Sequence, residues 1–345
     1  MVVLYATTRS KIQIDTPNNT LNKDVAPDGG LYVPYQLPLI DIDGLETLKK
    51  LDFCGCMALI LNRFFGSKLT RWDLEFSIGR NPVRLHALHQ NVAVAEMWHN
   101  HSFSLDAMAR DISALLQGCD KNLVAVTNWT KIAVRIAALF CIFGELLRQK
   151  QIGKNQKIDI AVATGDMSSV VAMQYCKRMG LPIGKIICGS SENSDLWDLL
   201  HHGEINIGAS LKRKVITGFD FAITPGLERL IYEELGREES CRFARIESEK
   251  DIYRLPEAPL ERFCADLFPA VVGQKRMVNV IRSTFSTQKY LMCPFTALAY
   301  AALQDYRAGT GELGIALVMS EQSPELYSNI ISKVKMMSES EKESD

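Results

Sequence analysis

The sequence predicts an α/β fold with a mostly parallel central sheet. Apolar runs at Val92–Met97, Ile158–Ala163 and Gly314–Met319 have the length and composition of buried strands. Helical patterns lie between them, and a glycine turn joins the strand at Ile158–Ala163 to a helix at Ser169–Met179. Strands that alternate with helices are typical of parallel sheets, which are covered on both faces.

Length and composition indicate a globular protein with a sizeable core. The chain has 345 residues, of which 47% are hydrophobic, and 39 basic side chains nearly cancel 40 acidic ones. No overall field therefore favours nucleic acid or an anionic membrane as a partner. No apolar run approaches the roughly 20 residues of a spanning helix, and the start lacks the order of a signal peptide. We expect a cytoplasmic protein that contacts neither nucleic acid nor membrane.

The nine cysteines are an odd number scattered through apolar segments, which indicates reduced thiols. Cys54 and Cys56 form the one close pair, but positions i and i+2 of a helix point to different faces. We therefore expect no metal site.

The first hundred residues begin with an apolar strand that ends at Thr7–Ser10. Pro27-Asp28-Gly29-Gly30 then predicts a tight turn before a strand that Pro34 closes. Helical spacing predicts one helix over Leu45–Phe65 and a second over Leu69–Ile78.

A polar break follows the strand that begins at Val92. Residues 99–102 interrupt the apolar pattern, which resumes as a helix over Leu105–Leu116. Asn128 is placed to cap the next helix, Trp129–Leu147, whose apolar character predicts burial. Turns between strands and helices are where sites are built.

Two further turns end strands of the predicted sheet. Thr164–Ser168 leads into a helix, so it is either an ordinary turn capped by Asp166 and Ser168 or a phosphate loop formed by backbone N–H groups. Pro294 marks a helix start, and Ser320 ends the last strand. Residues 336–345 have the composition of a disordered acidic tail.

Several of these motifs resemble the threonine synthases. DGGLYVP at residues 28–34 matches that family's N-terminal signature, and Glu96-Met97-Trp98-His99 opens a stretch similar to its lysine block. Asn128-Trp129 resembles a helix start in its large domain, and Leu291–Ala299 follows another of its segments. The resemblance implies a tryptophan synthase β-like three-layer fold.

In that family a lysine carries pyridoxal phosphate (PLP) as a Schiff base. Asp106 occupies the lysine position here, or the lysine is deleted, and a carboxylate cannot condense with an aldehyde. Only 21 residues separate Asp106 from Asn128, whereas the family inserts a small mobile domain of several dozen residues there. We therefore expect this domain to be largely deleted and PLP to bind non-covalently at most.

The resemblance assigns remnant roles to a few residues and none to a catalytic group. Gly165, Asp166, Ser168 and Ser320 correspond to the phosphate and ring site, and His99, Ser102 and Asn128 to the substrate cleft. We expect a threonine synthase N-terminal-like region at 1–110 and a large α/β domain at 111–335.

Three functions follow from this resemblance. The first is a catalytically degenerate protein with a binding or regulatory role, whose ligand is a small phosphorylated compound or an amino acid. The second is an active threonine synthase-type lyase that converts O-phosphohomoserine to threonine with a lysine from elsewhere, Lys131 and Lys121 being nearest in sequence. The third is an interaction subunit that pairs with a second copy or with an active threonine synthase.

Overall fold

A computed structural model describes residues 2–10, 14–40, 42–101, 103–191, 194–207 and 224–328. Within these ranges the central sheet has six strands in the order β3-β4-β10-β5-β6-β9. The strands are β3 (Arg84–Leu88), β4 (Val92–Glu96), β5 (Ile158–Ala163), β6 (Ile183–Ser190), β9 (Leu267–Val271) and β10 (Ala316–Ser320). All neighbours pair in parallel except β3, which forms an antiparallel hairpin with β4. The expected mostly parallel sheet is confirmed.

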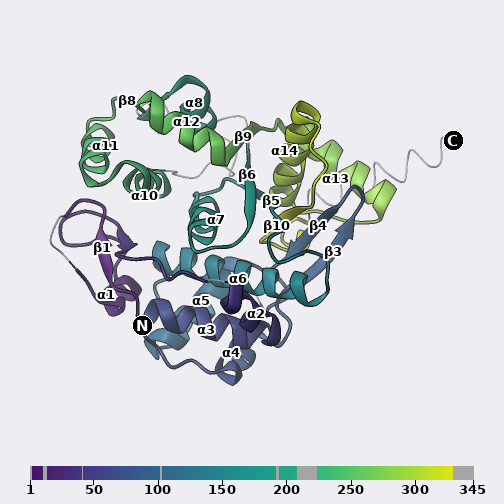
Figure 1. Ribbon diagram of the computed structural model, residues 1–345, viewed down its shortest axis with the longest axis horizontal. Coiled ribbons are helices and arrows are strands. Elements are labelled where there is room, and N and C mark those ends of the chain that lie inside the picture. Colours follow the sequence, from purple (N-terminus) through teal and green to yellow (C-terminus); the bar gives the residue numbers. More distant parts are fainter. Residues whose placement is uncertain are drawn as a thin grey trace.

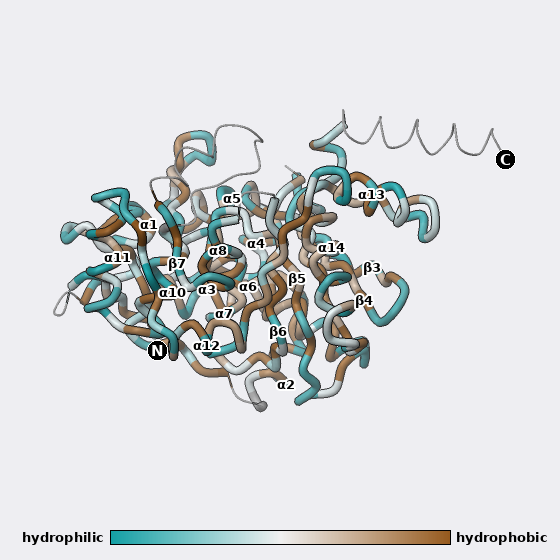
Figure 2. Tube along the Cα trace, turned by 90° about the horizontal axis from the view of Figure 1, so that it is seen from above, coloured by the Kyte–Doolittle hydropathy of each residue, from teal (hydrophilic) through white to brown (hydrophobic). Residues whose placement is uncertain are grey.

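Helices cover both faces of this sheet, so the fold has three layers (Figure 1). Ile160 and Ile186 face the core beneath α6 (Asn128–Arg148) and α7 (Ser168–Arg178), whereas Ala161 and Ile187 face α13 (Gln274–Gln288) and α14 (Pro294–Thr310). This alternation follows from the two-residue period of a strand. The strands at the centre are hydrophobic along their length (Figure 2) because both faces are buried.

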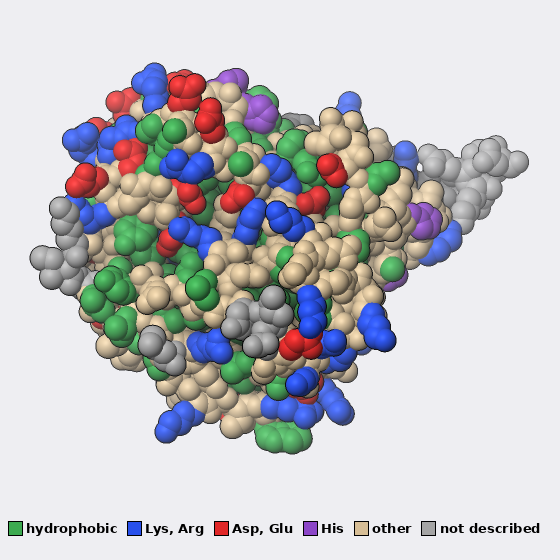
Figure 3. All heavy atoms as spheres, in the orientation of Figure 1, with side chains coloured by type: hydrophobic (Ala, Val, Ile, Leu, Met, Phe, Trp, Pro, Cys, Tyr) green, Lys and Arg blue, Asp and Glu red, His purple; other side chains and the backbone are tan. Residues whose placement is uncertain are grey.

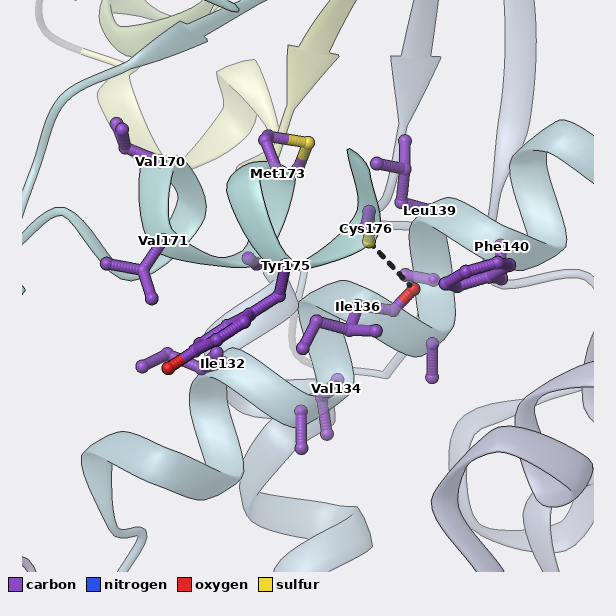
Figure 4. Packing of buried hydrophobic residues seen from close by; sticks show 14 of the residues in the cluster. Ile132, Val134, Ile136, Leu139, Phe140, Val170, Val171, Met173, Tyr175 and Cys176 are labelled. Atoms are coloured by element: carbon purple, nitrogen blue, oxygen red, sulfur yellow. Dashed lines mark hydrogen bonds between the residues drawn. The ribbon is translucent and has the colours of Figure 1, made fainter. Parts of the chain in front are cut away.

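Helix α6 is the main buried helix of the molecule, as its apolar sequence predicts. It packs on α7 through side chains such as Ile132, Ile136 and Val171 (Figure 4), and the Cys176 thiol donates to the Ile136 carbonyl at 3.8 Å. The expected cap at Asn128 is wrong. Thr127 caps the helix instead, because its hydroxyl accepts the Thr130 N–H at 3.2 Å, and Asn128 is the first helical residue.

The expected helix over residues 45–65 is two helices, α2 (Ile42–Lys50) and α3 (Phe53–Phe65). Asp52 ends the first pattern and caps α3 by accepting the Gly55 N–H at 2.9 Å. The apolar spacing continues across the break, and for this reason it suggested a single helix. Helix α4 (Arg71–Ile78) follows with a capping box at Thr70 and Asp73.

The N-terminal segment is tied to the middle of the chain. Strands β1 (Tyr5–Thr7) and β2 (Tyr32–Pro34) form a two-stranded sheet beside α1 (Pro17–Asn22). Arg9 forms an ion pair of 2.8 Å with the buried Glu228, and the Thr8 hydroxyl also donates to that carboxylate. Glu228 belongs to α10 (Thr224–Leu235), so this contact joins segments 219 residues apart.

The remaining elements lie at the β9 side of the molecule. They are α8 (Asp195–His202), β7 (Glu204–Asn206), α11 (Arg237–Glu249), β8 (Ile252–Arg254) and α12 (Glu257–Asp266). Strands β7 and β8 pair as a second small sheet, and a short 3-10 helix, η1 (Pro324–Tyr327), follows β10. The expected tail at 336–345 lies outside the described residues.

Helix α5 (Leu105–Gln117) leads almost directly into α6. Residues 118–127 alone join the two helices, so the chain inserts no separate domain at this point. None of the helices in the described ranges is both long and apolar enough to cross a bilayer. On the face in Figure 3, acidic and basic side chains are interspersed, in keeping with the balanced composition.

Candidate functional site

A cavity of about 140 Å³ opens at the carboxyl ends of β5 and β10. In open α/β sheets ligands bind at this edge, beyond the ends of neighbouring strands. The lining combines five charged side chains with small and apolar ones: Asp106, Lys131, Arg135, Val162, Ala163, Thr164, Gly165, Asp166, Ser169, Phe295, Met319, Glu321 and Gln322. The sequence-predicted Asp106, Gly165 and Asp166 therefore meet in one place.

Asp106 is engaged in an ion-pair network rather than free in the cavity. Arg135 Nη2 lies 2.9 Å from Asp106 Oδ1 and 2.7 Å from Glu321 Oε2. Arg135 Nε donates to the Ser169 hydroxyl at 2.9 Å, and that hydroxyl donates to the second oxygen of Glu321. Helices α5, α6 and α7 and the segment after β10 each contribute one member, so the network joins four parts of the fold.

Charge and burial act against each other in this network. Burial by itself lowers the pKa of the Arg135 guanidinium, but the carboxylates of Glu321 and Asp106 outweigh it and raise that pKa. Arg135 in turn holds the pKa of the Asp106 carboxyl below its usual range. Both groups are therefore charged at neutral pH.

The turn after β5 is closed by its own side chains. Gly165 and Met167 have positive φ angles of 49° and 65°, and the Asp166 carboxylate accepts the Ser168 N–H at 3.0 Å. The Ser168 N–H belongs to the first turn of α7, where N–H groups have no partner within the helix. In a phosphate loop such a group would face the ligand. The Asn128 amide donates to the Ser168 hydroxyl at 3.1 Å, so the side chains of Asp166 and Ser168 are both used to hold the turn.

A lysine also reaches this cavity. Lys131 Nζ lies 4.0 Å from Asp166 Oδ2, and its side chain is 29% exposed. Lys121, the other lysine considered from the sequence, lines a different groove beside α4 and α5.

The structure places Ser320 apart from the cavity. Its hydroxyl accepts the Trp98 indole N–H at 3.0 Å and the Thr296 hydroxyl at 2.8 Å, and the residue is 1% exposed. Neighbouring Met319 and Glu321 line the cavity instead, and Phe295 contributes an aromatic wall.

His99 does not join this arrangement. His99 Nε2 lies 2.6 Å from Glu96 Oε2, and its ring stacks on Trp98 with centroids 4.1 Å apart. Ser102 lies outside the described residues. Among the described residues no cluster of three or more potential ligands could hold a metal ion.

Arg135, Ser169 and Glu321 are site residues that the sequence analysis missed. Arg135 had a visible signal, because it is a charged residue within a run of apolar ones, and buried charges are paired. Glu321 directly follows a buried strand, where polar residues gather at the sheet edge. Ser169 carried no comparable signal.

Comparisons with known proteins bear on the N-terminal region first. Residues 4–81 match the family model described as threonine synthase N terminus. Threonine synthase-like 1 of Pongo abelii is 26% identical over 176 residues, which cover 50% of this chain and 24% of that protein. The chain thus spans about a quarter of the length of this relative.

Threonine synthase-like 2 of Xenopus laevis matches over a longer stretch. It is 24% identical over 395 residues, covering 86% of this chain and 83% of the relative. A match over 395 residues exceeds the 345 residues of this chain, so the relative carries segments that this chain lacks.

Solved threonine synthases share the fold. The structure entitled PLP-bound threonine synthase from Brucella melitensis has a TM-score of 0.81 at 16% identity, with 96% of this chain and 91% of that chain covered. Yeast threonine synthase has a TM-score of 0.78 at 14% identity, with 96% and 89% covered. The N-terminal match and the threonine synthase-like relatives make this chain similar to the threonine synthases, and its fold is the fold of the solved threonine synthases.

Proposed function

We propose that this chain is a threonine synthase-like protein that has lost the covalent cofactor chemistry of its family and works by binding. The observation that carries the proposal is the ion pair of 2.9 Å between Asp106 and Arg135, because Asp106 takes the lysine position of the family motif when the two are compared without gaps and the lysine is deleted when one gap is allowed. A carboxylate held as the partner of a buried guanidinium offers no nucleophilic amine.

The cavity also fits the phosphate of PLP poorly. Asp106, Asp166 and Glu321 bring three negative charges to the lining, against two positive charges from Lys131 and Arg135. The Ser168 N–H that could hold a phosphate oxygen is already taken by Asp166. A phosphate dianion at this turn would meet carboxylate repulsion and lose its backbone donor.

The cavity fits the ring nitrogen of PLP poorly as well. The resemblance assigns this contact to Ser320, but the hydroxyl is buried between Trp98 and Thr296 and does not line the cavity. The fold is one that holds PLP in the Brucella melitensis protein, whereas the residues present here do not suit it. We therefore propose a small, non-phosphorylated ligand or a regulatory contact for this cavity.

One observation favours the enzyme alternative. Lys131 brings an amine into the cavity, beside the Gly165 turn. In a threonine synthase-type lyase that uses this lysine, Lys131 would have to leave Asp166 and hold the cofactor covalently. Pairing with a second copy or with an active threonine synthase stays a prediction.

One experiment separates these functions. The full chain is incubated with PLP, reduced with borohydride and analysed by intact and peptide mass spectrometry, with Lys131→Arg as the matched control. We expect the same low surface labelling in both proteins. Stoichiometric labelling at Lys131 in the wild type, lost in the variant, would refute the proposal. Rescue of a threonine auxotroph that depends on Lys131 would refute it independently.

A further inference from the structure

A second hollow in the surface lies apart from the cavity around Asp106. It is a groove of about 600 Å³ between the end of α4, one face of α5 and the segment that joins α5 to α6. Its lining residues are Phe76, Ser77, His101, Asp111, Ala114, Leu115, Gly118, Cys119, Asp120, Lys121 and Asn122. None of them lines the cavity around Asp106, so this groove does not depend on the function proposed above.

Asp111 is the unusual residue of this groove. It lies on α5, is 6% exposed, and no described group donates a hydrogen bond to its Oδ2. Burial raises the pKa of the Asp111 carboxyl, while the charges of Lys121, His101 and Arg110 lower it in part. A carboxylate that is buried without a partner destabilises the fold.

The charges nearby do not supply that partner. Lys121, His101 and Arg110 act on Asp111 through their charges, but none of them donates a hydrogen bond to its Oδ2. Asp120 adds a second carboxylate at the rim, where it accepts the Asn122 N–H at 2.7 Å. Two carboxylates, Asp111 and Asp120, thus line the groove against one lysine, Lys121.

The walls of the groove are apolar and partly aromatic. Phe76 is 89% exposed at the end of α4, and Ala114 and Leu115 present the adjacent face of α5. Trp72, one turn before Phe76, is 67% exposed. An aromatic ring beside a carboxylate favours organic cations, which gain from both groups.

We propose that this groove binds an organic cation, a guanidinium or primary ammonium group on an apolar stem, with Asp111 as its counter-ion. The cation pairs with the buried carboxylate at the base, and the stem covers Leu115 and the ring of Phe76. The cation belongs either to a free small molecule or to an arginine or lysine side chain of a partner protein.

The test uses the full chain and isothermal titration calorimetry. The probes are butylguanidinium chloride, butanol as the neutral match, and a short peptide with one arginine between neutral residues. We expect saturable binding of butylguanidinium and no binding of butanol. Asp111→Asn keeps the size of the side chain and should weaken binding of butylguanidinium at least tenfold. Asp305→Asn, in an exposed ion pair on α14, should leave it unchanged.

The melting temperature of Asp111→Asn distinguishes a loss of binding from a loss of folding. Asp111→Asn removes an unpaired buried charge, so its melting temperature at neutral pH should equal or exceed that of the wild type, and lost binding is then not lost folding. Tighter binding of the peptide than of butylguanidinium assigns the cation to a partner protein, and equal binding assigns it to a small molecule. No saturable binding by the wild type, or equal binding by Asp111→Asn, would overturn the proposal.

Discussion

Arg135 is the residue on which the cavity depends. Its side chain is 6% exposed and holds the carboxylates of Asp106 and Glu321 together with the Ser169 hydroxyl. A guanidinium suits this role because its fork of donors serves several acceptors in fixed directions. Removal of the guanidinium leaves the carboxylates of Asp106 and Glu321 without the cation that they share.

We expect Arg135→Ala to lower the free energy of unfolding by about 3–5 kcal/mol, the usual cost of removing one partner of a buried ion pair. Urea denaturation monitored by circular dichroism measures the change. Arg276→Ala, which removes an exposed pair with Asp305, should cost less than about 1 kcal/mol. Similar losses in the two variants would show that the network contributes little.

Asp106 should make stability depend on pH in the acid range. Arg135 lowers the pKa of this carboxyl in the folded state, so its stabilising effect is full above the unfolded pKa of about 3.9 and disappears as pH falls through the folded value. We expect Asp106→Asn to be less stable than the wild type at pH 7 and to approach it below pH about 4. Urea titrations of both proteins at several pH values test this, and a constant difference would contradict it.

Among the helices, the first residue of α6 shows how far its start could be predicted from the sequence. Both Thr127 and Asn128 are good caps by type, and the sequence alone did not distinguish them. The hydroxyl of Thr127 also donates to the Thr20 carbonyl at 2.7 Å, a contact from α1 that no local pattern reveals.

This cap gives a direct prediction. Thr127→Ala should lower the free energy of unfolding by about 1–2 kcal/mol, because it removes the cap of α6 and the bond to Thr20. Thr127→Ser keeps the hydroxyl and should recover most of the loss. Thermal or urea unfolding measures both variants, and an equal loss in serine and alanine would assign the effect to the methyl group.

Buried strands and helices were predictable because apolar runs of characteristic period mark them locally. Strand Ile158–Ala163 and the start of α14 at Pro294 lie where the sequence places them. The ion-pair network was not predictable from the sequence. Arg135 lies 29 residues from Asp106 and 186 residues from Glu321 along the chain. Such distances are set by the tertiary fold, which a local pattern does not contain.

The whole molecule depends on close contact between its layers. Gly189 of β6 lies against the backbone of α14, where an added Cβ would overlap the carbonyl oxygen of Leu298. Helix α14 could then no longer pack at its present distance from the sheet.

We expect Gly189→Ala to lower the free energy of unfolding by about 1–3 kcal/mol, as overpacking does in other cores. Gly309→Ala, near the end of α14, meets no atom within 4 Å and should be neutral or stabilising by up to about 1 kcal/mol. Chemical denaturation of the two variants provides the comparison, and a neutral Gly189→Ala would show that the layers can shift apart.

Strand β10 is the last strand within the described residues, yet it lies between β4 and β5 and pairs with both. During synthesis, β4 and β5 therefore wait with unpaired edges until residue 320 has left the ribosome, and exposed strand edges invite association with other chains. A nascent chain that stops short of Ala316 has a gap in the middle of its sheet. Such fragments should accordingly aggregate or be degraded in the cell. The full chain should need chaperones more than its length suggests.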